Sequence, residues 1–160
     1  MKLLFQIFSA YLAVFPLVAK EPANLPSLFQ VRLVVDQPTE DSEAMTMTVK
    51  GTGKTIMRTI NVQKKSLIDL TVVDKAAVTK HPLSGKPLIE ITLTAEGRKL
   101  FAEVTRKHIR QELAIIFDGK IYTTFAGEAK DGVFPLVVSE SQTEATLTVK
   151  KLNAALKGRH

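Results

Sequence analysis

The amino-acid sequence predicts an α+β fold, with a two-layer sandwich in the order β-α-β-β-β-α in its C-terminal half. One observation is a set of short runs rich in apolar and β-branched residues, which are typical of strands, at 88–93, 112–117, 120–125 and 133–138. The other is that residues 95–108 and 141–156 carry apolar residues at helical spacing. Each of these helices has one apolar stripe and therefore needs one sheet face to bury it.

The N-terminal half of the chain is predicted to consist mainly of strands. Residues 28–35 alternate apolar with polar side chains, as a half-buried strand does. Residues 45–49 and 55–62 are rich in Thr, Ile, Met and Val and flank a segment that contains two glycines, so we expect a loose hairpin. A short helix is expected at 71–77, followed by a turn at 81–86. In the C-terminal half, the strand at 133–138 is expected to be broken near Pro135.

A longer helix is expected directly after the strand at 88–93. Thr94 is a suitable N-cap for this helix, and Gly97 in its first turn destabilises it by about 1 kcal/mol relative to Ala. Its apolar stripe consists of Leu100, Phe101 and Val104. We expect Phe101 and Val104 to be buried against the apolar strand residues Ile89, Ile91, Leu113 and Ile115.

The last elements have specific turn and capping signals. Asp118-Gly119 lies between two strand patterns and is a strong signal for a two-residue hairpin turn. Ser141 and Glu144 have the spacing of a capping box at the start of the final helix. The buried stripe of that helix is expected to contain Ala145, Val149, Leu152 and Leu156. The whole pattern predicts a sandwich in the ferredoxin-like style, preceded by a strand- and hairpin-rich segment.

Residues 1–19 have the features of a secretory signal peptide. Lys2 is followed by an uncharged apolar run, and Ala19 is a small residue before a polar boundary. An uncleaved membrane anchor is the alternative. After the signal peptide we expect a flexible lead at 20–27, a β-rich segment at 28–86 and the α+β domain at 87–157. Export of a chain without Cys favours a bacterial protein that is periplasmic or secreted.

The composition argues against several kinds of site. The absence of Cys excludes disulfides, thiolate zinc sites and thiol nucleophiles. His81, His108 and His160 have no second ligand at helical or hairpin spacing, so no metal is expected. Ser139 and Ser141 lack the Gly-x-Ser-x-Gly context of a nucleophile. With no acid–base pair in evidence either, we expect no enzymatic activity and no cofactor.

A glycine-rich segment resembles part of a phosphate-binding loop. Gly51-Thr-Gly-Lys-Thr55 would need a further glycine at position 48, where the chain has Thr48, and a helix after Thr55. Because residues 56–62 are β-like, a hairpin turn is the preferred interpretation, and no nucleotide is expected.

The chain carries 22 Lys and Arg and 16 Asp and Glu residues, a net charge of +6. These charges are dispersed, and nucleic acid is not an expected partner of an exported protein. A solvated surface is the main interpretation. Weak attraction to an anionic membrane surface or to acidic segments of other chains stays open.

An ordered motif spans residues 89–127. A strand is followed by Thr94-x-Glu96-Gly97, then by Phe-Ala-Glu-Val-Thr at 101–105 and by Leu-Ala-Ile-x-x-Asp-Gly-Lys at 113–120. This motif resembles the first periplasmic domain of the bacterial protein-export subunit SecD and of its fused form SecDF. Unlike SecD, the chain has no later apolar run long enough to span a membrane, and it lacks the family's glycine before the last helix.

The resemblance implies a non-enzymatic periplasmic module that contacts unfolded or emerging polypeptide, or an envelope protein such as the export machinery. A structural or regulatory envelope domain with one specific partner is an alternative. An enzyme is a further alternative, which would require an exposed polar cluster that converges in a pocket.

The candidate contact surface is an apolar patch on the hairpin at 112–125. If Leu113, Ile115 and Phe117 face the helices, strict alternation leaves Ile116, Ile121 and Phe125 on the open face of the sheet. There an extended polypeptide could add to an open sheet edge. The alternative is that the strands at 28–35 and 45–62 fold over this patch and cover it.

Overall fold

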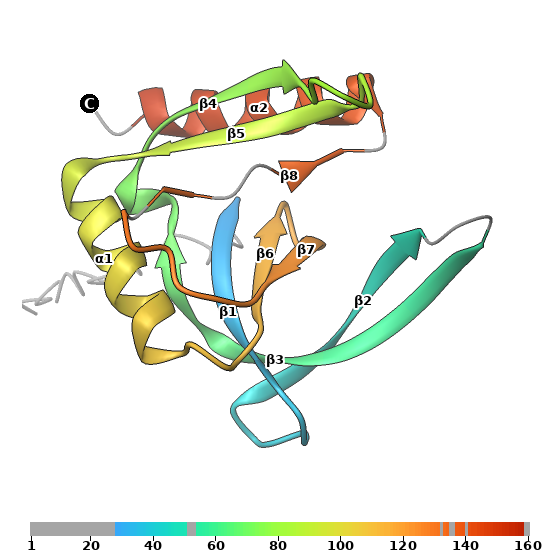
Figure 1. The fold of residues 1–160 in the computed structure, drawn as a ribbon, viewed down its shortest axis with the longest axis vertical. Helices are drawn as coiled ribbons and strands as arrows, with labels where there is room; N and C mark the ends of the chain where they lie inside the picture. The colour runs from blue at the N-terminus through green and yellow to red at the C-terminus, as the bar shows by residue number, and fades with distance from the viewer. Residues whose placement is uncertain (1–27, 51–53, 132, 135–136, 140, 159–160) are drawn as a thin grey trace, which may run out of the picture.

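The part of the chain that the structure describes contains eight strands, two α-helices and one 3₁₀ turn, joined by loops (Figure 1). The structure is a computed structural model, and it describes residues 28–50, 54–131, 133–134, 137–139 and 141–158. The strands are β1 (Phe29–Val35), β2 (Ser42–Lys50), β3 (Thr55–Asp69), β4 (Val73–Lys80), β5 (Pro87–Leu93), β6 (Leu113–Phe117), β7 (Lys120–Phe125) and β8 (Val137–Val138). The helical elements are the 3₁₀ turn η1 (Leu70–Val72) and the α-helices α1 (Ala95–Lys107) and α2 (Gln142–Lys157).

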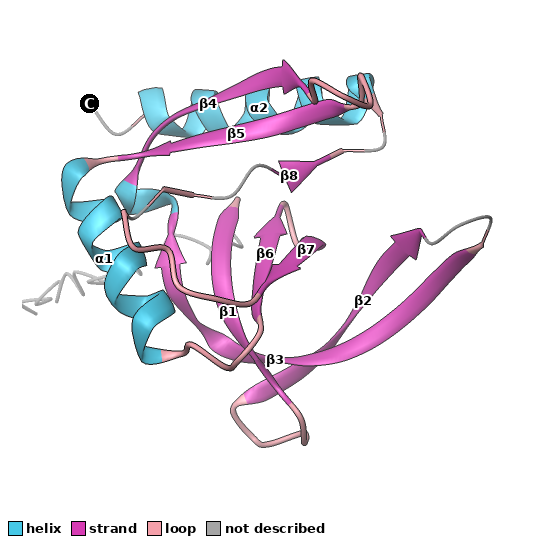
Figure 2. Cartoon of the chain, viewed as in Figure 1, coloured by secondary structure: helices cyan, strands magenta, loops and turns pink. Residues whose placement is uncertain are grey.

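The strands form two antiparallel sheets (Figure 2). The first sheet has the order β2-β3-β1-β6-β7, and the second has the order β4-β5-β8. Helix α2 packs on β4 and β5, and α1 contacts β3 and β5. The main core combines apolar side chains from both sheets and both helices. The predicted α+β class is therefore confirmed, with the strands divided between two sheets.

The predicted boundary at residues 86 and 87 does not separate two bodies of structure. Strands β1, β2 and β3 share the first sheet with β6 and β7, and β4 shares the second sheet with β5 and β8. Residues 28–86 and 87–157 therefore contribute to both sheets and to one main core.

The first sheet curls, which brings its two edge strands β2 and β7 close together. Inside the curl lies a second apolar cluster formed by Met47, Ile60, Val62, Ala114, Ile116 and Ile121. Strands β2 and β3 continue beyond this cluster as a two-stranded ribbon that projects from the body of the molecule (Figure 1). We call this ribbon the β2–β3 arm. It confirms the predicted hairpin, and its turn residues 51–53 lie outside the described residues.

Two ion pairs tie the arm to the rest of the first sheet. Arg32 of β1 pairs with Glu43 of β2. Arg58 of β3 pairs with Glu112, which precedes β6, with 3.5 Å between Nη2 and Oε2. Both pairs lie nearer to the body of the molecule than the hairpin turn does, so they fix the base of the arm and leave its outer part unsupported.

Helix α1 begins where the sequence predicts it, and Gly97 allows it to pack closely. Thr94 Oγ1 accepts a hydrogen bond from Gly97 N at 3.0 Å, and Thr94 N donates to the Val72 carbonyl oxygen at 2.9 Å. A Cβ at Gly97 would lie only 2.5 Å from that same oxygen. Phe101 and Val104 are buried with their predicted strand partners, but Leu100 is exposed.

The predicted short helix at 71–77 is wrong. Only Leu70–Val72 form a 3₁₀ turn, and Val73 begins strand β4. Asp69 caps the turn by accepting a hydrogen bond from Thr71 N at 2.8 Å. The chain then pairs with β5, because burial of Val73 and Ala76 in the main core outweighs a weak helical preference.

The segment at 133–138 is a strand only in its last described residues. Val137 and Val138 pair with Ile89 and Leu88 of β5, whereas residues 133–134 belong to no strand and residues 135–136 lie outside the described residues. Phe134 lies before this short strand and inserts into the main core, where its ring centroid is 5.1 Å from that of Phe101.

Helix α2 is fixed at both ends of its buried face. Ser141 Oγ accepts a hydrogen bond from Glu144 N at 3.4 Å, which is one half of the predicted capping box. Near its C-terminal end, Asn153 bonds to both backbone groups of Ala76 in the edge strand β4, at 3.1 and 2.9 Å. Asn153 therefore occupies an edge that another chain could otherwise extend.

The predicted signal peptide and flexible lead, residues 1–27, lie outside the described residues. None of the helices in the described part of the chain is both long and apolar enough to cross a membrane.

Candidate functional site

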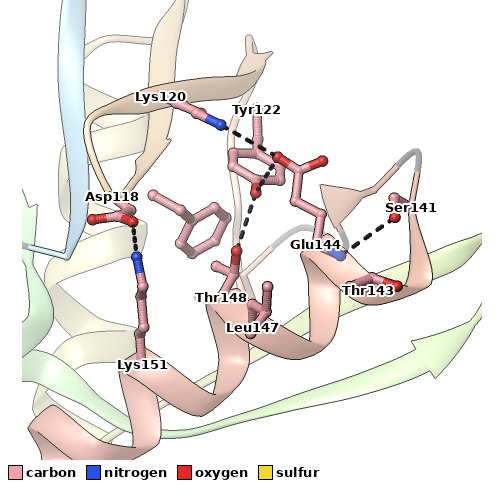
Figure 3. Close-up of a pocket in the computed structure, with 10 residues that line it drawn as sticks. Asp118, Lys120, Tyr122, Ser141, Thr143, Glu144, Leu147, Thr148 and Lys151 are labelled. Atoms are coloured by element: carbon pink, nitrogen blue, oxygen red, sulfur yellow. Dashed lines mark hydrogen bonds and ion pairs between the residues drawn. The ribbon is translucent and has the colours of Figure 1, made fainter.

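Two adjoining cavities lie beside strand β7, and we call them together the β7 site. The first, of about 470 Å³, lies between the β6–β7 hairpin and α2 (Figure 3). The second, of about 510 Å³, extends toward β8 and the β2–β3 arm, with Thr46, Thr48 and Met57 in its lining. Lys120, Tyr122 and Glu144 line both cavities, so this trio is the centre of the site.

A hydrogen-bonded group joins β7 to α2 at this centre (Figure 3). Tyr122 Oη donates to Glu144 Oε1 at 3.1 Å and lies 3.1 Å from Thr148 Oγ1. Since the phenol has one proton, its oxygen can accept the Thr148 hydrogen. Lys120 Nζ lies 3.8 Å from the same Glu144 oxygen. The Tyr122 ring also packs edge-on against Phe117, with 5.1 Å between centroids.

Tyr122 remains a neutral phenol at ordinary pH. Burial raises the pKa of Tyr122 above its usual value, the hydrogen bond from Thr148 lowers it, and the nearby Glu144 carboxylate raises it again. A phenol with a raised pKa is a poor base and a poor nucleophile near neutral pH. The arrangement is suited to holding β7 against α2.

A second ion pair closes the outer end of the site. Lys151 of α2 pairs with Asp118 in the β6–β7 turn (Figure 3). Asp118 and Gly119 have positive φ values of 49° and 75°, as a two-residue type I′ turn requires. The predicted hairpin turn is therefore confirmed. With Lys120 and Glu144, the site carries two positive and two negative side chains.

The expected open apolar face is wrong. Ile116 and Ile121 are only 1% and 8% exposed and belong to the cluster inside the curled first sheet. Strands β2 and β3 cover them through Met47, Ile60 and Val62. This covering of the patch by N-terminal strands is the alternative stated in the sequence analysis.

Phe125 lies on the opposite face from Ile116 and Ile121. Its ring packs against Phe101 in the main core, with 5.9 Å between centroids. The cause is a β-bulge: Ile115 pairs with Thr123 but Ile116 pairs with Ile121, so Tyr122 is an extra residue in β7. The bulge reverses the alternation that the sequence argument assumed.

The residues at the centre of the β7 site were not identified from the sequence. The sequence predicts that Glu144 completes a capping box by accepting a hydrogen bond from Ser141 N. In the structure its carboxylate accepts from Tyr122 Oη, and Ser141 N donates to Ser139 Oγ at 3.4 Å. The available signal was a tyrosine in a short strand near a turn, with Glu144 and Thr148 four residues apart on one helix face.

The edge of β7 is relevant to binding. Within the described residues, β7 forms a ladder with β6 alone. Its other edge faces β2 across the curl of the first sheet without a ladder between them, and it borders the cavities of the β7 site, where Val138 and Leu147 are exposed. An unpaired strand edge next to exposed apolar side chains is a surface to which an extended chain can be added.

The other candidate residues have structural contacts. His81 Nδ1 accepts hydrogen bonds from Leu83 N and Ser84 N at 3.3 and 3.1 Å, which stabilises the turn before β5. His108 Nδ1 lies 2.6 Å from Gln111 Oε1, and His160 lies outside the described residues. In the described part of the chain, no three His, Asp or Glu side chains are grouped to hold a metal ion. Thr55 begins a strand, where a phosphate-binding loop would need a helix.

Comparison with known proteins identifies the relatives of this fold. The family model described as the SecDF P1 head subdomain matches residues 42–156. The chain is similar to the protein translocase subunit SecDF of Thermus thermophilus, with 51% identity over 39 residues, which are 24% of this chain and 5% of that protein. It is also similar to the subunit SecD of Desulfurispirillum indicum, with 40% identity over 48 residues, 30% of this chain and 9% of that protein. The chain thus matches less than a tenth of the length of these relatives.

Two solved structures share the fold. One is of SecDF, described as a membrane component that enhances protein export, with a TM-score of 0.59 and 20% identity over 79% of this chain and 61% of the other. The second is a crystal structure of SecDF in a super-membrane-facing form, with a TM-score of 0.58 and 22% identity over 79% of this chain and 18% of the other.

Proposed function

Because the chain belongs to the family of SecDF P1 head subdomains, we propose that it is a non-enzymatic module of protein export that binds extended polypeptide at the β7 site. The single observation that carries the binding site is the edge of β7 that has no ladder partner among the described residues and lies beside two cavities. Backbone hydrogen bonds to a strand edge depend little on sequence, which suits a module that meets many different unfolded chains.

The side chains around the edge are suited to this role. Val138, Leu147 and Met57 supply exposed apolar contacts on different sides of the β7 site. Lys120 and Glu144 at the centre provide one charge of each sign, so the site does not select strongly for acidic or basic clients. The Tyr122 hydrogen bonds hold β7 in place while its outer edge stays available.

The site of action that fits this proposal is the bacterial periplasm. The apolar run at 3–19 after Lys2 supports export, and cleavage after Ala19 would give a mature chain that begins at Lys20. N-terminal sequencing of the protein recovered from the periplasm of its host tests this point. Recovery with Met1 from the cytoplasm would contradict it.

Polypeptide binding is tested with a permanently unfolded probe, reduced and carboxymethylated α-lactalbumin, by fluorescence anisotropy. We expect the full chain to bind this probe but not native α-lactalbumin. Val138→Asp and Leu147→Asp place a carboxylate beside the β7 edge and should weaken binding about tenfold or more, because charge is unfavourable at an apolar contact.

Matched controls place the same substitution at exposed apolar residues away from the site. Leu83→Asp, in the turn before β5, and Ile109→Asp, after α1, should leave the affinity within about twofold of wild type. No binding by the wild-type chain, or equal losses in the site and control variants, would contradict the proposed site.

A further inference from the structure

The outer part of the β2–β3 arm is exposed on both of its faces. All residues from Lys54 to Thr59 are exposed, and Ile56 and Met57 are 57% and 73% exposed. Val49 pairs with Ile56, whereas Met57 pairs with Thr48, so the apolar side chains lie on opposite faces of the ribbon. A two-stranded ribbon without cover is only marginally stable in water.

The distribution of these side chains restricts what can cover them. A groove or a flat protein surface would bury one face of the ribbon and leave the other in water. The arm projects from the molecule (Figure 1), so it can enter a medium that surrounds it on both faces. The boundary between lipid headgroups and acyl chains is such a medium for side chains of this size.

The charge of the arm points to an anionic surface. The outer arm, residues 48–59, contains Lys50, Lys54 and Arg58 but no Asp or Glu. Arg58 pairs with Glu112, and Lys50 and Lys54 flank the hairpin turn. Each cation held near an anionic bilayer strengthens binding about fivefold.

We propose that the outer β2–β3 arm inserts into the surface of a bilayer that contains anionic phospholipid. Val49, Ile56 and Met57 enter the interface, and Lys54 contacts the headgroup phosphates. This interaction shares Met57 with the lining of the second cavity of the β7 site but uses none of its Tyr122–Glu144 centre, and it does not require polypeptide binding. It would hold the module at a membrane surface with the base of the arm fixed by the Arg58–Glu112 pair.

The absence of Cys allows a single reporter to be placed on the arm. Met57→Cys carries an environment-sensitive fluorophore, and Leu83→Cys, an exposed apolar position on the turn before β5, is the matched control. With vesicles of phosphatidylcholine mixed with phosphatidylglycerol, we expect the emission at position 57 to shift to shorter wavelength and to resist quenching by iodide. The emission at position 83 should not change, and residues 1–27 are the same in both proteins.

Charge variants test the electrostatic part. Lys54→Glu should weaken binding to the mixed vesicles about tenfold or more, whereas Lys150→Glu, the same charge change on the exposed face of α2, should have a much smaller effect. Vesicles of phosphatidylcholine alone should bind more weakly, and added salt should reduce binding to the mixed vesicles.

Three outcomes would overturn the proposal. The first is an unchanged emission at position 57, and the second is an equal change at positions 57 and 83. The third is that polyglutamate changes the emission at position 57 as much as the vesicles do, and that Ile56→Ser does not alter this response. That result would identify the arm as a site for acidic polypeptide.

Discussion

Replacement of Gly97 by Ala tests the close packing of α1 on the 3₁₀ turn. On helix propensity alone, this substitution would stabilise the protein by about 1 kcal/mol. The added methyl group would lie 2.5 Å from the Val72 carbonyl oxygen, 2.9 Å from Val72 Cβ and 3.2 Å from Leu93 Cβ. None of these atoms is the end of a flexible side chain, so relief of the clash requires the backbone of α1 or η1 to move.

The magnitude follows from the competing effects. Overpacking of this kind costs about 1–3 kcal/mol. Movement of Val72 also weakens the hydrogen bond that its carbonyl accepts from Thr94, which is worth about 1 kcal/mol. After subtraction of the propensity gain, we expect Gly97→Ala to lower the free energy of unfolding by about 1–3 kcal/mol.

Urea denaturation followed by circular dichroism measures this change. Lys99 is exposed two residues later in the same helix, so the difference between Lys99→Gly and Lys99→Ala gives the propensity effect without the clash. If Gly97→Ala stabilises the protein by as much as that difference, α1 does not pack on Val72 as described, and the reasoning is refuted.

Three other substitutions test the core and the β7 site. Phe101→Ala should lower the free energy of unfolding by about 3–5 kcal/mol, because the ring is buried among aromatic neighbours; a loss below about 1 kcal/mol in urea denaturation would show that the helix face is wrong. Ile121→Ser should lower the free energy of unfolding by about 2–4 kcal/mol, because Ile121 is buried under the base of the arm. An unchanged free energy of unfolding would mean that Ile121 lies on an exposed face of the sheet. Tyr122→Phe should cost about 1 kcal/mol at neutral pH through loss of two hydrogen bonds. Since the folded state raises the pKa of Tyr122, its stabilising effect is complete below the ordinary tyrosine value and is lost as the pH rises through the folded value. Unfolding measured from about pH 8 to pH 11 should therefore show a decline in the wild type that Tyr122→Phe lacks; equal declines would contradict the assigned contacts.

Local signals in the sequence were sufficient for most of the individual elements. Thr94 and Ser141 cap their helices, and Asp118-Gly119 forms its turn, because these effects depend on residues only a few positions apart. The requirement for glycine at position 97 could not be predicted in this way, because it comes from the close approach of Val72, which is distant in the sequence.

The candidate site could not be predicted in the same way. Strict alternation places Ile116, Ile121 and Phe125 on one face only if the strand is unbroken, and the bulge at Tyr122 moves Phe125 to the opposite face. The sequence also does not specify that strands far apart in the chain share a curled sheet, because that arrangement depends on long-range packing. The Tyr122–Glu144 contact depends on both the bulge and the curled sheet, so the sequence alone does not predict it.

The most direct test of polypeptide addition at β7 is amide hydrogen exchange of the full chain with and without the unfolded α-lactalbumin probe. Addition of a strand would give partners to the outward-facing N–H groups of β7. We predict slower exchange at residues 120–125 in the presence of the probe, and no change at residues 73–80 of β4, whose edge Asn153 already occupies. Unchanged exchange at 120–125 while the probe is bound, or slower exchange at β4 instead, would contradict the account.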